Sequence, residues 1–392
     1  MVDNRTSFSS TGIRMDIDDL FRRMEAAHAS DMHLCVGEPA VLRCDGELRR
    51  IDGAALGGGD ITAILGRLMT EAQHHEFENE REVDFAVDFE KSRFRVNAFH
   101  NRQGPALVLR HIQSDPPALA DLGTPDILAR LTALEKGLIL VTGPTGSGKS
   151  STLAAMIRQI NESSARHVIT VEDPIEFIHT SKRSLITQRE VGRDTASFRR
   201  ALRSALREDP DVILVGELRD HETIGLALTA AETGHLVLGT LHTTSAHRAL
   251  LRIVDAMPAA ERDMARTMLA TSLQAVIAQT LLPKTGGGRV GAYEILIGTH
   301  AVRHMIQENQ PAQIYSAMQI GSAHGMQTMT DAVGEHVRAA RVDPEIAREL
   351  ILSLGDGQDQ KNEPQVERRA RSPQPEPEPE PAAGQKAKGW SF

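Results

Sequence analysis

A glycine-rich segment, "GPTGSGKS" (residues 143–150), carries the strongest chemical signal in the sequence. It fits the pattern G-x-x-x-x-G-K-[ST], and it lies between a stretch typical of a strand and a stretch typical of a helix. Gly143, Gly146 and Gly148 let the backbone turn tightly, so that successive N–H groups point at phosphate oxygens. The helix that begins near Lys149 adds the positive end of its dipole. The segment therefore predicts binding of a nucleoside triphosphate.

Two side chains of this segment have specific roles in phosphate chemistry. Lys149 is expected to reach the β- and γ-phosphates, and the Ser150 hydroxyl is expected to coordinate Mg²⁺. ATP and Mg²⁺ are the expected cofactors. The residues expected to contact the nucleotide are Gly143, Pro144, Thr145, Gly146, Ser147, Gly148, Lys149, Ser150 and Ser151.

A second candidate for this chemistry is "DPDVILVGELRD" (209–220), which is typical of a buried strand that ends at an acidic residue. Gly216 stands where many nucleotide hydrolases have an aspartate, so only Glu217 remains. Ligands of open α/β sheets lie beyond the carboxyl ends of the strands. Glu217 is therefore a candidate to orient the attacking water and to help hold Mg²⁺ through water. The alternative is a surface carboxylate paired with Arg219.

A further acidic turn, "VEDPIEF" (171–177), follows another expected strand. Its carboxylates also occupy positions at the carboxyl end of a strand, and Pro174 restricts the backbone of the turn. The spacing alone leaves open whether Glu176 or Glu217 activates the water.

Histidines and arginines complete the set of candidate residues. His235 and His242 stand at the two ends of one expected strand, about 20 Å apart, so they cannot both touch one phosphate. Only His242 lies at the carboxyl end, where it could sense the γ-phosphate. Arg95 and Arg110 belong to strands nearer the amino terminus, and their spacing alone is typical of solvent-facing arginines. An arginine supplied to a phosphoryl-transfer site is nevertheless worth ~10³–10⁵ in rate.

Two segments of different pattern must position these residues. Residues 16–113 mix strands and helices in an α+β pattern, whereas 126–355 alternate helices with short apolar strands, as in a parallel sheet covered on both faces. The segment 114–125, rich in Pro and Asp, is the expected linker. Residues 1–15 are expected to be a disordered lead, and 356–392, with a Pro-Glu repeat and Trp390, a disordered tail.

Individual elements follow from the periodicity. The expected elements are an amphipathic helix from Ile17, a helix around 60–77, strands near 83–89, 93–99 and 107–112, and strands at 137–141, 167–171, 212–215 and 236–240. After residue 245 the chain is expected to be mainly helical, except for a strand that follows the glycines of "TGGGRVGAYEIL".

Composition excludes several classes of protein. A chain of 392 residues is long enough for two domains. A net charge of −9 argues against a protein devoted to nucleic-acid backbones, so no nucleic-acid partner is expected. Two cysteines, Cys35 and Cys44, cannot form a disulfide framework or a four-thiolate zinc site, which favours a reducing compartment. The sequence shows no secretory signal and no apolar run of membrane-spanning length, so a cytoplasmic location is expected.

Several long motifs resemble those of the secretion-ATPase superfamily, and especially the PilT-like retraction ATPases of type IV pili. They are "GLILVTGPTGSGKSSTLAAM", "VEDPIEF", "QREVGRDT", "LRSALREDPDVILVGELRD" and "TAAETGHLVLGTLHTTSA". The resemblance runs from about Asp16 to about Leu350. It implies an α/β fold class, with a RecA-like P-loop ATPase domain and a smaller α+β, PAS-like amino-terminal domain.

The same resemblance implies a function and partners. The expected function is a homohexameric ATPase that powers pilus retraction and twitching motility at the cytoplasmic face of the inner membrane. An inner-membrane platform protein is the implied partner, and a paralogous retraction ATPase is a further candidate.

The resemblance also implies roles for single residues. Glu176 is the family's candidate for activating water, and a glycine before Glu217 is normal in the family. Arg95 and Arg110 match the arginines with which the amino-terminal domain reaches the nucleotide. His235 and His242 match the family's histidine box.

Three rival functions stay open. The first is an extension or secretion ATPase of the same superfamily, which commonly carries a four-cysteine zinc motif that two cysteines cannot supply. The retraction group has an "AIRNLIRE"-like segment, and "AVRHMIQE" (301–308) keeps Ala301, Arg303, Ile306 and Glu308 of it. The second is a RecA-like nucleic-acid motor. The third is a regulatory module that binds nucleotide with negligible hydrolysis.

Overall fold

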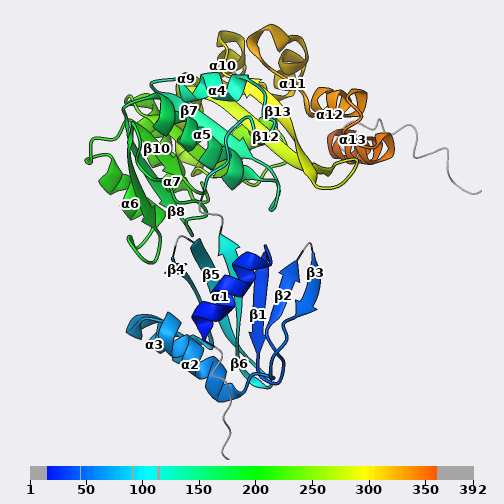
Figure 1. The fold of residues 1–392 in the computed structure, drawn as a ribbon. Coiled ribbons are helices and arrows are strands. Elements are labelled where there is room, and N and C mark those ends of the chain that lie inside the picture. Colours follow the sequence, from blue (N-terminus) through cyan, green and yellow to red (C-terminus); the bar gives the residue numbers. More distant parts are fainter. Residues whose placement is uncertain (1–15, 45, 91, 113–114, 360–392) are drawn as a thin grey trace, which may run out of the picture.

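The chain folds into two lobes joined by a short connection (Figure 1). The computed structural model describes residues 16–44, 46–90, 92–112 and 115–359. The expected lead and nearly all of the expected tail, including Trp390, lie outside the described residues. The N-terminal lobe ends at Ile112 and has its own hydrophobic core, and the P-loop lobe, which follows it, has separate cores. Each lobe is therefore stabilised by its own apolar residues.

The N-terminal lobe is a six-stranded antiparallel sheet packed with helices. The strand order is β3-β2-β1-β6-β5-β4. The strands are β1 (Asp31–Cys35), β2 (Val41–Cys44), β3 (Glu47–Arg50), β4 (Glu82–Phe89), β5 (Ser92–Asn101) and β6 (Gly104–Ile112), and the helices are α1 (Ile17–Ala26), α2 (Gly58–Leu68) and α3 (Glu71–Glu80).

The single helix expected around 60–77 is two helices, α2 and α3. Thr70 separates them by capping α3: its hydroxyl accepts from the Gln73 N–H, while the Gln73 side chain accepts from the Thr70 N–H. This reciprocal capping box starts a new helix and ends the previous one. The expectation of one helix was therefore wrong, because a local capping signal interrupts the apolar periodicity.

Helix α1 packs on β5, the strand that carries Arg95. Ile17, Leu20, Phe21 and Met24 are all buried, as their helical spacing predicts. The Phe21 ring stacks on Phe94 of β5, with 4.3 Å between the ring centroids. The N-terminal lobe thus gives β5 a rigid support.

The P-loop lobe is built on a seven-stranded sheet in the order β13-β12-β7-β11-β10-β8-β9. All neighbours are parallel except β13, which is antiparallel to β12. Every residue of β7, β10 and β11 is buried, as expected of central parallel strands. The strands are β7 (Gly137–Thr142), β8 (His167–Glu172), β9 (Leu185–Glu190), β10 (Val212–Val215), β11 (Leu236–Leu241), β12 (Leu273–Pro283) and β13 (Arg289–Ile297).

Two strands of this sheet were not expected, β9 and β12. The expectation of a mainly helical chain after residue 245 was wrong for β12, whose sequence "LQAVIAQTLLP" mixes Gln, Ala and Leu and has no clear strand alternation. Its position between β7 and β13 makes it a strand, because burial and pairing override a weak local preference. The polar sequence of β9, "LITQRE", suits its place at the edge of the sheet.

Helices cover both faces of this sheet (Figure 1). One hydrophobic cluster joins the sheet to α4 and α5, and another joins it to α6 through α11. The helices are α4 (Ile127–Thr132), α5 (Lys149–Ser163), α6 (Phe198–Ala205), α7 (His221–Glu232), α8 (Ala246–Asp255), α9 (Arg262–Ser272), α10 (His300–Gln307), α11 (Pro311–Ile320), α12 (Met329–Arg338) and α13 (Pro344–Asp359). Helix α13 thus extends past residue 355, where the folded part was expected to end.

The connection between the lobes packs on the P-loop lobe. Residues 115–125 form neither helix nor strand, in keeping with the expected linker. Leu119 is nevertheless buried in the hydrophobic cluster that joins the sheet to α4 and α5. Arg158 of α5 donates a hydrogen bond to the Pro116 carbonyl over 2.7 Å. The linker is therefore anchored to the P-loop lobe from near its start.

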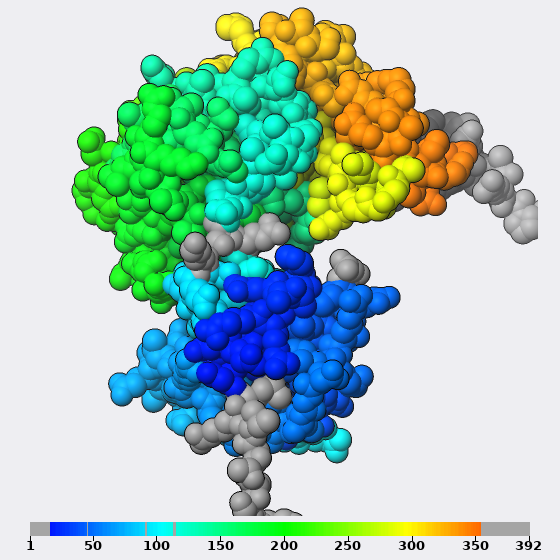
Figure 2. Space-filling view, viewed as in Figure 1, coloured from blue at the N-terminus to red at the C-terminus, as the bar shows by residue number. Residues whose placement is uncertain are grey.

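The lobes touch where β4 and β5 approach β9 (Figures 1 and 2). Arg93 of β5 forms an ion pair with Glu190 of β9, and Arg193 approaches Asp88 of β4. Within the described ranges, Cys35 and Cys44 are free thiols on β1 and β2. None of the helices described in the structure combines the length and the apolar character that a bilayer span requires.

Candidate active site

The loop between β7 and α5 requires glycine at three positions. Gly143, Gly146 and Gly148 have φ of 148°, 79° and 89°, in a region that only glycine adopts without strain. At Gly143 a Cβ would also lie 2.3 Å from the Gln279 carbonyl oxygen. All three glycines are therefore needed for the backbone conformation, and Gly143 is needed for space as well.

Gln279 of β12 supports this loop by a hydrogen bond from its side chain. Its side chain is buried, and its Nε2 donates to the Ser147 carbonyl over 2.7 Å. The sequence did not identify Gln279, because β12 was not recognised as a strand. Two further buried atoms of this region, Gln279 Oε1 and Ser147 Oγ, have no hydrogen-bond partner among the described residues.

Lys149 is folded back over the loop. Its ammonium donates to the carbonyls of Gly143 (2.8 Å) and Pro144 (3.1 Å). Burial lowers the pKa of Lys149, while the charges of Glu217 and Glu176 partly oppose that shift. The ammonium therefore lies between the phosphate loop and two carboxylates.

A cavity of about 480 Å³ opens beside the loop, at the carboxyl ends of the central strands. It brings together most of the residues singled out in the sequence. The members that line it are Arg110, Thr145, Gly146, Gly148, Lys149, Ser150, Ser151, Glu176, Glu217 and His242. Gly143, Pro144, Ser147 and Arg95 are not part of its lining.

The position of Gly216 explains the missing aspartate. Its N–H donates to the Val171 carbonyl of β8 over 2.7 Å. A Cβ at this position would lie 3.1 Å from the same oxygen and 3.2 Å from the Glu172 Cα. A larger side chain would therefore push β8 and its acidic turn away from β10.

Glu217, which follows, is paired on both of its carboxylate oxygens. Oε2 lies 2.7 Å from Arg219, and Oε1 lies 3.0 Å from His242 Nε2. Burial raises the pKa of Glu217, but Arg219 and His242 outweigh this effect and hold the pKa below its usual range. Glu217 therefore lines the cavity as an ionised group, and the pairing with Arg219 that the sequence offered as an alternative is present as well.

The turn after β8 contains carboxylates in different environments. Glu172 accepts hydrogen bonds from Thr170 Oγ1 (2.6 Å) and Gln188 Nε2 (3.2 Å), and burial raises its pKa to about 7. Glu176 is exposed at the edge of the cavity. Such a separation of neighbouring carboxyl groups by environment is common where acid and base roles are divided.

The two arginines named from the sequence differ in position. Arg110 lines the cavity and donates from Nε to Asp31 over 2.8 Å. Arg95 pairs with Asp84, which raises its pKa, and the acidic turn after β8 adds to this shift. Arg110 is therefore at the cavity, and Arg95 faces the turn from outside it.

His235 and His242, the two histidines named from the sequence, lie at opposite ends of β11. His242 reaches Glu217 in the cavity, whereas His235 lies at the opposite end of β11, where its ring contacts the Ala230 carbonyl. This agrees with the prediction that they cannot share one phosphate.

Two further ionisable side chains line the cavity without a signal in the sequence. Arg289, at the start of β13, follows the glycine turn. His179 follows the acidic turn, and burial lowers its pKa to about 4, so its ring is neutral near pH 7. Only the fold brings Arg289, which is distant in the chain, to the cavity.

The donor set fits Mg²⁺ bound mainly by substrate and water. Among the described residues no group of three or more His, Cys, Asp or Glu could hold a metal ion. Mg²⁺ in such sites is usually held by one or two protein oxygens, phosphates and water. Ser150 and Glu217 line the same cavity, but Arg219 and His242 already engage the carboxylate, so Glu217 fits as a partner through water.

A comparison with known protein families agrees with the sequence motifs and with the site. Residues 9–286 match the family described as "Type II/IV secretion system protein". This chain belongs to that family.

Relatives in the family resemble the chain along most of its length. It is 51% identical over 336 residues to "Type IV pilus retractation ATPase PilT" of Pseudomonas aeruginosa, covering 86% of this chain and 98% of that protein. It is 52% identical over 311 residues to "Twitching motility protein" of Neisseria gonorrhoeae, covering 79% and 83%. These matches confirm the resemblance to the PilT-like group.

A solved structure agrees with the fold. "Crystal Structure of the Pilus Retraction Motor PilT and Bound ADP" superimposes with a TM-score of 0.81 at 43% identity, covering 86% of this chain and 96% of that chain. The prediction of a RecA-like P-loop domain behind a smaller α+β domain is confirmed.

Proposed function

We propose that this protein hydrolyses ATP to power retraction of a type IV pilus and thereby twitching motility. The observation that carries the proposal is one cavity that unites Lys149, Ser150, Glu176, Glu217 and Arg110, in a chain 51% identical to a pilus retraction ATPase. The reaction is transfer of the γ-phosphoryl group to water. The chain supplies phosphate binding, a base and positive charge for it.

The binding step uses the P-loop. The backbone N–H groups of the loop and the start of α5 hold the β- and γ-phosphates, and Lys149 turns from the Gly143 and Pro144 carbonyls to the phosphate oxygens. Mg²⁺ that enters with ATP would neutralise phosphate charge, with Ser150 as its ligand and Glu217 as a partner through water. Burial around Lys149 strengthens its attraction to phosphate.

The hydrolytic step uses the acidic turn. Glu176, exposed to the cavity, orients the attacking water and accepts its proton. Glu217, held ionised by Arg219 and His242, organises water beside the γ-phosphate. Arg110, with Arg95 behind it, brings positive charge from the N-terminal lobe to stabilise the transferring group.

The proposed working form is a homohexamer in the cytoplasm, at the inner-membrane face of the pilus machine. ATP binding closes the P-loop lobe against the N-terminal lobe of a neighbouring subunit, and hydrolysis and release reopen it. The deformation of the ring turns an inner-membrane platform protein, so that pilin subunits return to the membrane. A paralogous retraction ATPase is a candidate to share this work.

Replacement of Lys149 tests the proposal. Lys149→Ala is expected to lower ATP turnover ~10²–10³-fold and to abolish pilus retraction, because the phosphate loses its half-buried cation. Lys182→Ala is a matched control, since Lys182 pairs with Glu162 on the surface of the same lobe. Full turnover and retraction in Lys149→Ala would contradict the proposal.

The rival functions predict different phenotypes. Deletion of the gene is expected to leave hyperpiliated cells that do not twitch, whereas loss of an extension or secretion ATPase leaves cells without pili. A RecA-like nucleic-acid motor predicts hydrolysis stimulated by DNA with steep salt dependence.

A further inference from the structure

A buried ion pair joins the two lobes at a distance from the phosphate loop. Arg93 of β5 places Nη2 2.7 Å from Oε2 of Glu190, the last residue of β9. The two side chains are only 5% and 8% exposed. Neither lines the cavity beside the P-loop. The pair is therefore a contact between lobes and not a part of the nucleotide pocket.

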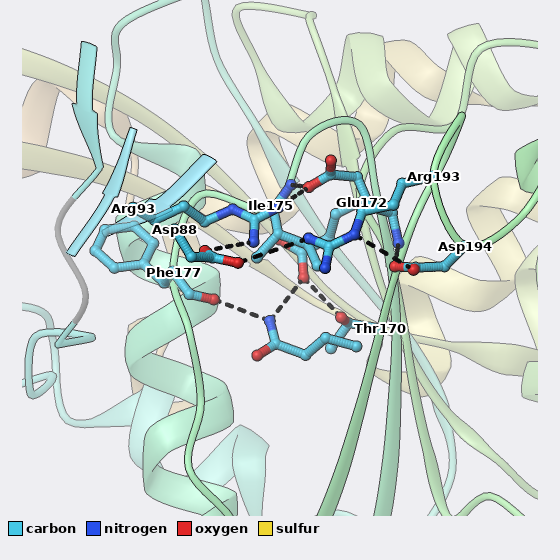
Figure 3. Close-up of polar contacts among 10 residues, drawn as sticks. Asp88, Arg93, Thr170, Glu172, Ile175, Phe177, Arg193 and Asp194 are labelled. Atoms are coloured by element: carbon cyan, nitrogen blue, oxygen red, sulfur yellow. Dashed lines mark hydrogen bonds and ion pairs between the residues drawn. The ribbon is translucent and has the colours of Figure 1, made fainter. Parts of the chain in front are cut away.

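The same carboxylate oxygen also holds the acidic turn. Oε2 of Glu190 accepts a hydrogen bond from the Ile175 N–H over 3.1 Å (Figure 3). Ile175 is the residue immediately before Glu176, the candidate base. Glu190 thus links a guanidinium of the N-terminal lobe to the backbone that places Glu176.

A second side chain of β9 holds the turn without any link to the other lobe. Gln188 donates from Nε2 to Glu172 Oε1 and to the Phe177 carbonyl, and its Oε1 accepts from the His179 N–H. Gln188 therefore fixes both ends of the turn within the P-loop lobe. Of the two side chains, only Glu190 makes the turn depend on the position of β5.

The outer part of the junction is different in character. Arg93 also pairs with Asp88 over 3.0 Å, and Arg193 lies 3.9 Å from the same aspartate. Asp88 and Arg193 are more than half exposed, and exposed ion pairs contribute little. Of these ion pairs, the buried pair of Arg93 and Glu190 is therefore the one able to couple the lobes strongly.

We propose that Glu190 is a positioning residue for the turn that carries Glu176, and that Arg93 makes this positioning depend on contact between the lobes. The proposal rests on the proposed function in so far as Glu176 acts on water. With Arg93 in place, the Glu190 oxygen stays on the Ile175 N–H. When the N-terminal lobe moves away, a buried carboxylate is left without its cation, which is unfavourable. The Glu190 side chain then turns outward to solvent, and Glu176 loses its alignment.

Steady-state kinetics of the full-length assembled enzyme give the first test. Arg93→Gln and Glu190→Ala are each expected to lower kcat about tenfold and to change KM for ATP less than about twofold, because they misplace the base and leave the phosphate loop intact. Arg193→Gln is the matched control at the same junction, and its kcat is expected to stay within about twofold of wild type.

Amide hydrogen exchange of the segment 172–178 gives a second readout that does not need ATP turnover. Arg93→Gln is expected to speed exchange of the Ile175 amide severalfold, although the hydrogen bonds described for Arg93 go to Asp88 and Glu190 and not to the turn. Exchange in β10 and β11 is expected to remain at the wild-type rate. Arg93→Lys keeps the charge, and its Ile175 amide is expected to exchange more slowly than that of Arg93→Gln and close to the wild-type rate.

The outcomes separate this inference from the proposed function. If Arg93→Gln and Glu190→Ala assemble normally and keep both the wild-type kcat and the wild-type Ile175 exchange, the inference is overturned. An Ile175 exchange rate in Arg93→Gln equal to that in Arg93→Lys would also overturn it. If the wild-type protein does not hydrolyse ATP, the proposed function fails, and the exchange experiment still decides the role of the pair.

Discussion

The phosphate loop and the acidic turn hold their functional groups in opposite ways. The P-loop takes its geometry from consecutive residues, since three glycines with positive φ shape it and Gln279 is its one described side-chain brace from another strand. The acidic turn is held by Gln188 and Glu190 of β9, and through Glu190 by Arg93 of the other lobe. The phosphate loop is thus held within its own lobe, whereas the placement of Glu176, the proposed base, also depends on a contact with the other lobe.

This contrast suits a machine whose lobes move. A self-contained loop keeps its affinity for phosphate in every arrangement of the lobes. In our proposal, Glu176 is aligned as a base only in the arrangement in which Arg93 contacts Glu190. Nucleotide binding and hydrolysis can then occur in different states of the same subunit, which a cyclic motor requires.

Among substitutions in the acidic turn, replacement of Glu176, the proposed base, should lower kcat most. Glu176→Gln is expected to lower kcat ~10²–10⁴-fold with little change in KM, since a general base contributes about that much. Glu217→Gln should lower kcat less and raise KM as well, because Glu217 also organises water around Mg²⁺. Single-turnover hydrolysis and nucleotide binding measured on both variants decide between the two carboxylates. A larger loss of kcat in Glu217→Gln would reverse the assignment.

Replacement of Gln279, which supports the phosphate loop, should have a smaller effect, and the effect should be on ATP binding. Gln279→Ala leaves the Ser147 carbonyl without its buried donor, which costs about 1–3 kcal/mol. We expect about tenfold weaker ATP binding by titration calorimetry, with kcat at saturation nearly preserved. Gln274→Ala is the control on the same strand, because Gln274 donates to the exposed end of β7 at Lys136. Equal effects of the two substitutions would show that Gln279 has no special role.

The smallest effect on activity is expected at Glu172, whose carboxyl group affects the pH dependence of stability instead. Glu172 has a pKa of about 7 in the folded chain and an ordinary value of 4.5, so the folded state retains its proton between these values while the unfolded state loses it. Stability is therefore highest below pH 4.5 and falls as pH rises toward 7, by at most about 1.4 kcal/mol per pH unit. In Glu172→Gln this slope should disappear. Thermal unfolding midpoints of both proteins at pH 5 and pH 8 test this, and an unchanged difference between them would contradict it.

The sequence predicted those parts of the site whose signal is local. The G-x-x-x-x-G-K-S pattern, the strand ends at Glu217 and in the 171–177 turn, and the separation of His235 from His242 all follow from short spacing. The sequence also predicted the apolar central strands, because strands buried on both faces are continuous runs of Val, Ile and Leu.

Other features depended on pairing between distant segments. Strand β12 has a sequence that suits a helix nearly as well, and only its place between β7 and β13 makes it a strand and brings Gln279 under the loop. The retained Arg303 of "AVRHMIQE" turned out to donate to the carbonyls of Gly298, Thr271 and Leu273, where it ties α10 to α9 and β12. No local pattern reveals such partners.

By itself, the sequence determined that the chain binds nucleotide phosphates and where the candidate carboxylates stand, because backbone turns and strand ends are local consequences of residue type. The tertiary structure decided how those groups are held. It showed that β8 leaves little room for a side chain at Gly216 and that Glu217 is paired on both oxygens. It also showed that Arg93 and Glu190 connect the N-terminal lobe to the turn. These are contacts between residues far apart in the chain, and their energies depend on burial, which exists only once the lobes have folded and met.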